Sequence, residues 1–164
     1  MTEYVGQVEG RGRRIAVLAS RFNEEITRRL LAGALAALAR AGVADEDLDV
    51  VWVPGAWELP VAARVIIDLQ RHDAVVALGA VIRGDTAHFA YVAGEAARGL
   101  ATLQAETGTP IGFGVLTCDD WDQAEARSGG AHGNKGEDAA HAALELVDLF
   151  ARLDSEPSGG PDPA

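Results

Sequence analysis

The chain has 164 residues, of which 48% are hydrophobic and 24% charged, and its formal net charge is −11. This length predicts one folded domain that can bury a substantial core. The acidic balance argues against nucleic-acid binding, because contacts to a phosphate backbone need clustered cations and the densest cationic stretch is Arg11, Arg13 and Arg14.

The lone cysteine and the N-terminal segment indicate in which cellular compartment the protein is expected. Cys118 has no partner for an internal disulfide, so cysteine usage gives no sign of secretion. The first residues lack the apolar stretch of a signal peptide. The longest apolar run, Ala74–Ile82, is too short to span a bilayer. We therefore expect a soluble, cytoplasmic protein that binds no membrane.

The first predicted strand is Arg14–Ser20, and a helix follows it. Asn23 is the expected N-cap, and Glu24 and Glu25 lie favourably against the helix dipole. Gly42 is a plausible residue to follow the helix C-terminus. The helix is amphipathic, and its apolar residues are Ile26, Leu30, Ala34 and Leu38, with Leu31 and Leu35 beside them.

The rest of the chain continues the alternation of strands and helices. Asp49–Val53 predicts a strand that ends at Pro54 and Gly55, and a helix starts near Pro60. Asp73–Ile82 is continuously apolar, which is typical of a strand buried on both faces. The later predicted elements are a helix over Thr86–Glu106, a strand over Ile111–Thr117, a short helix over Asp120–Arg127, a glycine-rich loop over Ser128–Gly136 and a helix over Glu137–Leu153 with Ala140, Leu144, Val147 and Ala151 on one face.

Residues 1–153 are thus predicted to form one α/β domain, and residues 154–164 a disordered tail without apolar side chains. The alternation implies a parallel sheet with helices on both faces. Ligands of such sheets bind at the carboxyl ends of the strands. Here those ends are Ser20–Phe22, Pro54–Glu58, Ala80–His88 and Thr117–Asp119.

Two of these strand ends carry a residue with two possible roles. Phe22 precedes the N-cap, so it can pack as a hydrophobic staple or stack on a planar ligand. Glu58 follows Trp57 in a turn, where its carboxylate is either a solvated charge at a helix start or a hydrogen-bonding group for a polyol.

The segment Arg83–His88 joins the third strand to the long helix. Free N–H groups at a helix N-terminus beside a glycine form a ready anion site. Asp85 or Thr86 can instead be the N-cap. His88 lies one turn into the helix, where it is either structural or a general acid or base.

Arg127 ends the short helix before the glycine-rich segment. An arginine there suits bidentate capture of a phosphate, although it can simply stabilise the helix C-terminus. Lys135 precedes a helix start and can face the same anion. Gly129–Gly136 is no P-loop, because it does not follow a strand and Lys135 is followed by Gly136.

No metal site is expected. The histidines and Cys118 lack the spacing of zinc ligands. Cys118 at a strand end is better explained as a packed thiol than as a nucleophile.

Five sequence blocks, in this order and spacing, resemble the lumazine synthase family over about residues 5–152. The blocks are R-F-N-E-E-I at 21–26, V-P-G-A-W-E-L-P at 53–60, A-L-G-A-V-I-R-G-D-T-A-H-F at 77–89, F-G-V-L-T at 113–117 and G-N-K-G-E-D-A-A at 133–140.

This resemblance implies a flavodoxin-like three-layer α/β/α sandwich with a four-stranded parallel sheet. It implies condensation of 5-amino-6-(D-ribitylamino)uracil with 3,4-dihydroxy-2-butanone 4-phosphate to 6,7-dimethyl-8-ribityllumazine, with release of phosphate and water. The family uses no cofactor and no metal.

The resemblance also implies roles for individual residues. His88 is the proton-transfer residue. The residues expected to hold the ribitylaminouracil are Phe22, Ala56, Trp57, Glu58, Ala80, Val81, Ile82 and, from a neighbouring subunit, Phe113. The residues expected to hold the butanone phosphate are Asp85, Thr86, Arg127 and Lys135. Two departures from the family pattern affect that phosphate site, namely Ala87 in place of a second threonine and Asp85, whose carboxylate repels a phosphate unless it caps the helix or points away.

The family assembles as pentamers, and in some members twelve pentamers form an icosahedral shell. The short loop 128–136 favours the shell. Sites shared between adjacent subunits are expected, and riboflavin synthase is a candidate partner. Two alternatives are an archaeal-type riboflavin synthase and a non-catalytic flavin-binding or shell-forming relative. The blocks around Asp85 and Lys135, and the set of Phe22, Glu58, His88 and Arg127, favour the lumazine synthase interpretation.

Overall fold

The computed structural model describes residues 1–155, which contain a four-stranded sheet with the strand order β2-β1-β3-β4. Every neighbouring pair of these strands is parallel. The predicted parallel sheet is therefore confirmed, and its order matches the first four positions of a flavodoxin-type sheet. The strands are β1 (Ile15–Ser20), β2 (Leu48–Val53), β3 (Ala74–Ile82) and β4 (Ile111–Cys118).

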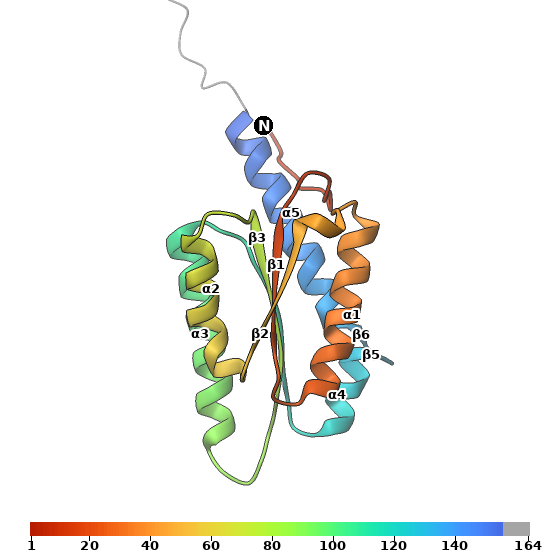
Figure 1. The fold of residues 1–164 in the computed structure, drawn as a ribbon, viewed down its shortest axis with the longest axis vertical. Coiled ribbons are helices and arrows are strands. Elements are labelled where there is room, and N and C mark those ends of the chain that lie inside the picture. Colours follow the sequence, from red (N-terminus) through yellow and green to blue (C-terminus); the bar gives the residue numbers. More distant parts are fainter. Residues whose placement is uncertain (156–164) are drawn as a thin grey trace, which may run out of the picture.

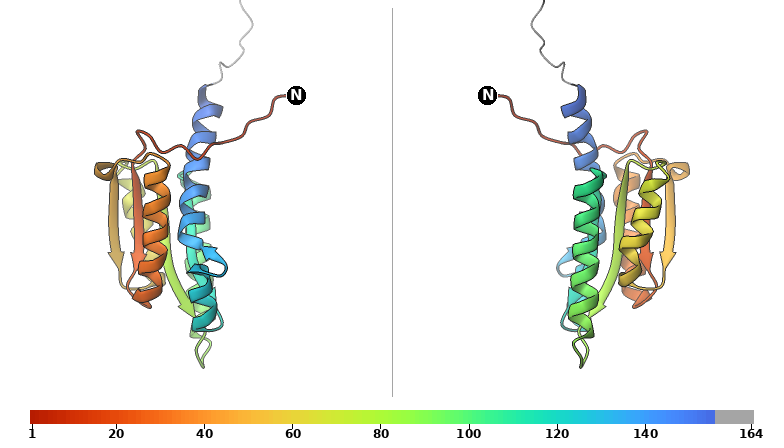
Figure 2. Two further views of the ribbon diagram at one scale, coloured as in Figure 1. Left: turned by 90° about the vertical axis from the view of Figure 1, so that its right-hand side faces the viewer. Right: turned by 90° about the vertical axis from the view of Figure 1, so that its left-hand side faces the viewer.

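Helices cover both faces of the sheet, so the predicted three-layer arrangement is also confirmed (Figures 1 and 2). One face carries α2 (Leu59–Asp68) and α3 (His88–Thr107), and the other carries α1 (Glu24–Arg40), α4 (Trp121–Arg127) and α5 (Lys135–Ser155). Two short 3-10 helices, η1 (Asp45–Asp47) and η2 (Ala56–Glu58), flank β2. Among residues 1–155, no helix is both long and apolar enough to cross a membrane.

The two faces of the sheet bury separate hydrophobic cores. Along β3, Val76 and Leu78 pack towards α1 and α5, whereas Val75 and Ala77 pack towards α2 and α3. All four side chains are 0% exposed. This two-sided burial explains why β3 is a continuous apolar run rather than an alternating one.

Glycines let α5 approach the sheet closely. A Cβ atom at Gly112 of β4 would lie 2.1 Å from the carbonyl oxygen of Ala139 in α5. At Gly114 it would lie 2.5 Å from Cδ2 of Leu78. Backbone contact at Gly112 thus brings α5 close to β4, and Leu, Ile and Val side chains fill the rest of the two cores.

Asn23 precedes α1 as predicted, but its side chain does not cap the helix. The residue adopts the left-handed conformation with φ of 57°, and its Nδ2 donates to the carbonyl oxygen of Ala80 at 2.9 Å. The amide therefore fastens the turn after β1 to the carboxyl end of β3. At the other end of α1, Gly42 has a φ of 97°, as expected for a glycine after a helix.

The glycine-rich segment contains a small hairpin that the sequence did not predict. Strands β5 (Ser128–Gly130) and β6 (Gly133–Asn134) pair in antiparallel fashion. The Oδ1 atom of Asn134 accepts from the N–H groups of Gly136 and Glu137, and its Nδ2 donates to the carbonyl of Arg29. Because Asn134 caps the helix in this way, α5 begins at Lys135 rather than at the predicted Glu137.

Two other helix boundaries differ from the predictions by two residues. Helix α3 begins at His88 instead of Thr86, and neither Asp85 nor Thr86 is its N-cap. Helix α5 continues to Ser155, and Ala151 on its predicted buried face is exposed because this end of the helix extends past the sheet (Figure 1). The predicted tail therefore starts inside a helix, and its residues 156–164 lie outside the described residues.

The close approach of α5 to β4 can be tested by filling the space at Gly112. We expect Gly112→Ala to lower the free energy of unfolding by about 2–3 kcal/mol or more, because the added methyl group meets backbone that cannot move aside. Urea unfolding followed by circular dichroism measures the loss. Gly94→Ala is the control, since no atom lies within 4 Å of its added Cβ and alanine favours the helix. Equal stabilities of the two variants would contradict the packing described.

Candidate active site

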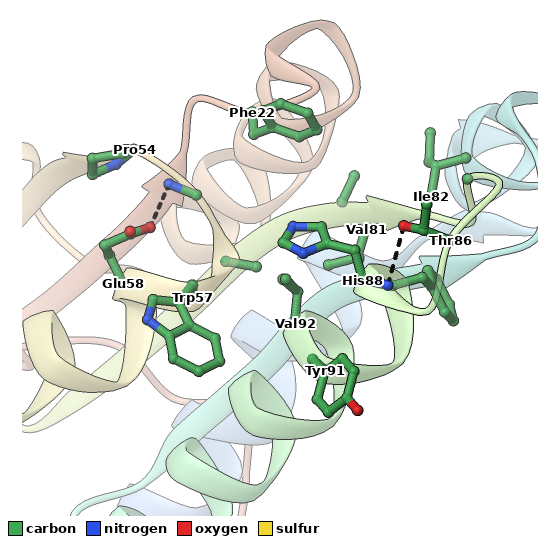
Figure 3. Close-up of a pocket in the computed structure, with 15 residues that line it drawn as sticks. Phe22, Pro54, Trp57, Glu58, Val81, Ile82, Thr86, His88, Tyr91 and Val92 are labelled. Atoms are coloured by element: carbon green, nitrogen blue, oxygen red, sulfur yellow. Dashed lines mark hydrogen bonds between the residues drawn. The ribbon is translucent and has the colours of Figure 1, made fainter.

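A hollow of about 840 Å³ opens at the carboxyl ends of β1, β2 and β3 (Figure 3). The predicted site residues that line it come from four separate segments of the chain. They are Phe22, Ala56, Trp57, Glu58, Ala80, Val81, Ile82, Thr86 and His88. The other lining residues are Pro54, Gly55, Gly84, Phe89, Tyr91 and Val92.

Phe22 stands at the rim of the hollow. Its side chain is 72% exposed, which excludes the staple role, because a staple residue would be packed against the first turn of α1. The Phe22 N–H donates to the carbonyl of Pro54 at 3.0 Å and so fixes the backbone after β1 beside the backbone after β2. A ring held in this position is free to stack on a planar molecule.

Glu58 has one oxygen engaged in the fold and one free. Its Oε2 accepts from the N–H of Gly55 at 2.9 Å and closes the turn around η2. No donor within residues 1–155 reaches Oε1. The half-buried carboxylate is therefore held in a fixed orientation and can still accept a hydrogen bond from a ligand hydroxyl.

The loop between β3 and α3 presents unpaired backbone donors. Within the described residues, the N–H groups of Gly84, Asp85 and Thr86 have no acceptor. Nothing lies within 4 Å of a Cβ atom placed at Gly84, so a ligand can approach the backbone there. Thr86 Oγ1 accepts from the N–H of His88 at 3.4 Å. These features are those of an anion site at a helix N-terminus.

His88 and Asp85 differ in their relation to the hollow. The imidazole of His88 projects into the hollow between Phe22 and Trp57 (Figure 3). Asp85 is exposed, does not line the hollow, and makes no hydrogen bond or ion pair with any other residue of 1–155. Its carboxylate therefore neither caps α3 nor neutralises a cation.

The hollow contains no arginine or lysine among its lining residues. Its only basic side chain is His88, and Glu58 adds a negative charge. A phosphate dianion would find backbone donors there but no permanent positive charge to offset its desolvation.

The remaining predicted site residues lie elsewhere in the fold. Phe113, 47% exposed, pairs with Ala77, whereas Ala80 pairs with Leu116. Phe113 is therefore about 10 Å back along the strand from the hollow. Arg127 donates from Nη1 to the carbonyl of Gln123 at 3.1 Å, and Lys135 pairs with Asp138 at 2.8 Å. Arg127 is thus held on α4 and Lys135 on α5, and neither lines the hollow.

Sequence reasoning missed the lining residues Phe89, Tyr91 and Val92. The signal was present, because His88, Tyr91 and Val92 are spaced as neighbours on one face of a helix. Tyr91 is 68% exposed and joins Phe22, Trp57 and Phe89 among the aromatic side chains that line the hollow.

Cys118 and the histidines form no metal centre in the part of the chain that the structure describes. His72 instead meets Asp49 of β2, with 2.6 Å between Nε2 and Oδ2. Cys118 is 4% exposed at the end of β4, and this burial raises the pKa of its thiol.

Comparison with known proteins gives one consistent result. A family model described as 6,7-dimethyl-8-ribityllumazine synthase matches residues 12–151. A relative of that name from Gemmatimonas aurantiaca is 59% identical over 93% of this chain and 93% of its own length. One from Xanthomonas oryzae pv. oryzae is 50% identical over 93% of this chain and 99% of its own length. Another from Xanthomonas campestris pv. campestris is 48% identical over the same shares.

The buried thiol leads to a prediction about reactivity. Because Cys118 is 4% exposed and its raised pKa further lowers the fraction of thiolate, we expect no reaction with an uncharged thiol-modifying reagent in the folded protein and complete reaction in guanidinium chloride. Cys118→Ala should keep the turnover of the wild type. Glutathione serves as the control for reagent quality. Rapid labelling of the folded protein, or loss of turnover in the variant, would show that this thiol takes part in the chemistry.

Proposed function

The chain belongs to the 6,7-dimethyl-8-ribityllumazine synthase family, and from this premise we propose which of its residues perform the family's reaction. It is an enzyme of riboflavin biosynthesis, and it condenses 5-amino-6-(D-ribitylamino)uracil with 3,4-dihydroxy-2-butanone 4-phosphate. Family membership thus supports the lumazine synthase interpretation over the two alternatives, an archaeal-type riboflavin synthase and a non-catalytic shell protein.

The chemistry demands alignment more than activation. A weakly basic aromatic amine attacks a ketone to form an imine, phosphate leaves, and a second ring closes. Both reactants are intrinsically reactive, so holding them in one pocket can supply most of the rate acceleration. This fits a hollow that is rich in aromatic and backbone contacts and poor in ionisable groups.

The pyrimidine substrate is assigned to the rim and floor of the hollow. Phe22 stacks on the ring, a role supported by its exposed face next to Pro54. The backbone of Ala80–Ile82 binds the uracil edge. Ala56, Trp57 and the free Oε1 of Glu58 hold the ribityl chain, because a fixed carboxylate is a good acceptor for a polyol hydroxyl.

The phosphate of the second substrate is assigned to the loop after β3. The unpaired N–H groups of Asp85 and Thr86, with that of Gly84, supply neutral donors. The charge must come from Arg127 and Lys135, which lie outside the hollow of their own subunit. We therefore assign these two residues, together with Phe113, to the hollow of the adjacent subunit.

This sharing of residues requires an oligomer. A closed ring in which one face of each subunit meets the opposite face of the next satisfies the requirement. We propose a pentamer, and the short segment 128–136, which folds back as a hairpin, favours a shell of twelve pentamers. Riboflavin synthase, which would consume the product, is the candidate partner of such a particle.

His88 is assigned to proton transfer during imine formation and phosphate loss. We expect His88→Ala to reduce turnover by about 10²–10⁴-fold at most, because general acid–base catalysis is lost while substrate positioning is kept. The appearance of lumazine absorbance measures the rate. Complete inactivity in a variant that still assembles would show that alignment is not the main source of catalysis.

A mixing experiment tests whether the site is shared. Phe22→Asp and Arg127→Ala, made in separate chains, should each be nearly inactive. When the two chains are refolded together in equal amounts, a Phe22 face and an Arg127 face that are both intact should meet at about a quarter of the interfaces. Activity should return to that fraction of the wild type.

The control is the same pair of proteins mixed without unfolding, which should stay inactive. Mixed rings that contain both chains and show no recovery would mean that each subunit holds its complete site. Arg127 would then act on the hollow of its own subunit.

A further inference from the structure

Arg83 connects the start of the β3–α3 loop to two other parts of the fold. Its N–H donates to the carbonyl of Cys118 at 2.9 Å. Its Nε donates to Oδ1 of Asp119 at 2.8 Å. Its guanidinium lies over the ring of Phe89, 4.4 Å from the centroid. The backbone and the side chain of Arg83 are therefore both tied to neighbouring elements.

The contact with Phe89 closes the loop, because Arg83 and Phe89 stand on either side of residues 84–88. Phe89 itself packs against the core beneath α3 and lines the hollow. Asp119 is held in turn, since its N–H donates to Oε1 of Gln123 in the first turn of α4. The guanidinium thus joins both ends of the loop to anchored parts of the molecule.

Few other interactions hold residues 84–87 of the loop in place. Residues 84–87 are exposed, and within residues 1–155 their side chains make one hydrogen bond, the 3.4 Å contact from the N–H of His88 to Thr86. A loop that moves freely must be ordered when it binds an anion, and that ordering lowers the affinity.

We propose that Arg83 is a positioning residue for the butanone phosphate, which holds the N–H groups of Gly84, Asp85 and Thr86 in place without binding the phosphate itself. The proposal rests on the proposed function in that it takes this loop as the phosphate site. Direct binding is disfavoured, because the guanidinium is engaged by Asp119 and Phe89 and Arg83 does not line the hollow.

Steady-state kinetics of variants of the full-length enzyme test the proposal. Arg83→Met should raise KM for the butanone phosphate by about three- to tenfold, in keeping with the modest strength of exposed contacts of this kind, and leave KM for the pyrimidine unchanged. Arg83→Lys keeps the charge but loses the planar face and the Nε donor, so its KM should stay nearer to that of Arg83→Met than to the wild type.

Asp119→Ala separates positioning from direct binding. If Arg83 positions the loop, releasing it from Asp119 should raise KM for the butanone phosphate, and Arg83→Met combined with Asp119→Ala should be no worse than Arg83→Met alone. If Arg83 bound the phosphate directly, freeing its guanidinium would lower that KM. The matched control is Arg98→Met, which removes an exposed arginine of α3 that is paired with Glu95.

The proposal is overturned if Arg83→Met behaves like Arg98→Met, if Arg83→Lys restores the wild-type KM, or if Asp119→Ala lowers KM. Failure of the proposed function would look different, because the wild-type enzyme would then form no lumazine from the two substrates in the same assay.

Discussion

The parallel alignment of the four strands is the constraint on which the rest of the molecule depends. Parallel strands all end at one edge of the sheet, so segments far apart in the sequence meet there. The turn after β1 carries Phe22, the turn after β2 carries Glu58, and the loop after β3 leads to His88. The hydrogen bond from Asn23 to Ala80 and that from Phe22 to Pro54 then fix these turns relative to one another.

The hollow lacks the positive charge that would offset the desolvation of a phosphate. The chain has a net charge of −11, and the hollow adds Glu58 without any lysine or arginine. Backbone N–H groups supply directed partial charges but not a full positive charge. The proposed distribution of the site over two subunits follows from this imbalance. Arg127 of α4 and Lys135 of α5 are the cations that we propose a second subunit brings to the hollow.

The sequence predicted those features that depend on local patterns. The apolar run of β3, the helix face that includes Leu30 and the glycine after α1 all follow from rules of spacing and conformation. The strand ends indicated Phe22, Glu58 and His88, which do line one hollow. Asn134 was not recognised as a helix cap, because its role depends on a hairpin that brings it beside Arg29.

The contact of Arg83 with Phe89 was not predictable either. The two residues are close in sequence, but the contact requires the loop to fold back and Asp119 to arrive from a different strand end. The residue pattern indicated phosphate binding by Arg127 and Lys135, and the resemblance to the family added Phe113. None of the three lines the hollow, so their roles stay predictions.

The most direct measurement of the shared site is a crystal structure of the assembled enzyme with the pyrimidine substrate and inorganic phosphate bound. We expect phosphate within hydrogen-bonding distance of the N–H groups of Gly84, Asp85 and Thr86 of one subunit and of the guanidinium of Arg127 of the next. Phosphate held by the loop and Arg127 of the same subunit, or bound away from the loop altogether, would contradict the proposed shared site.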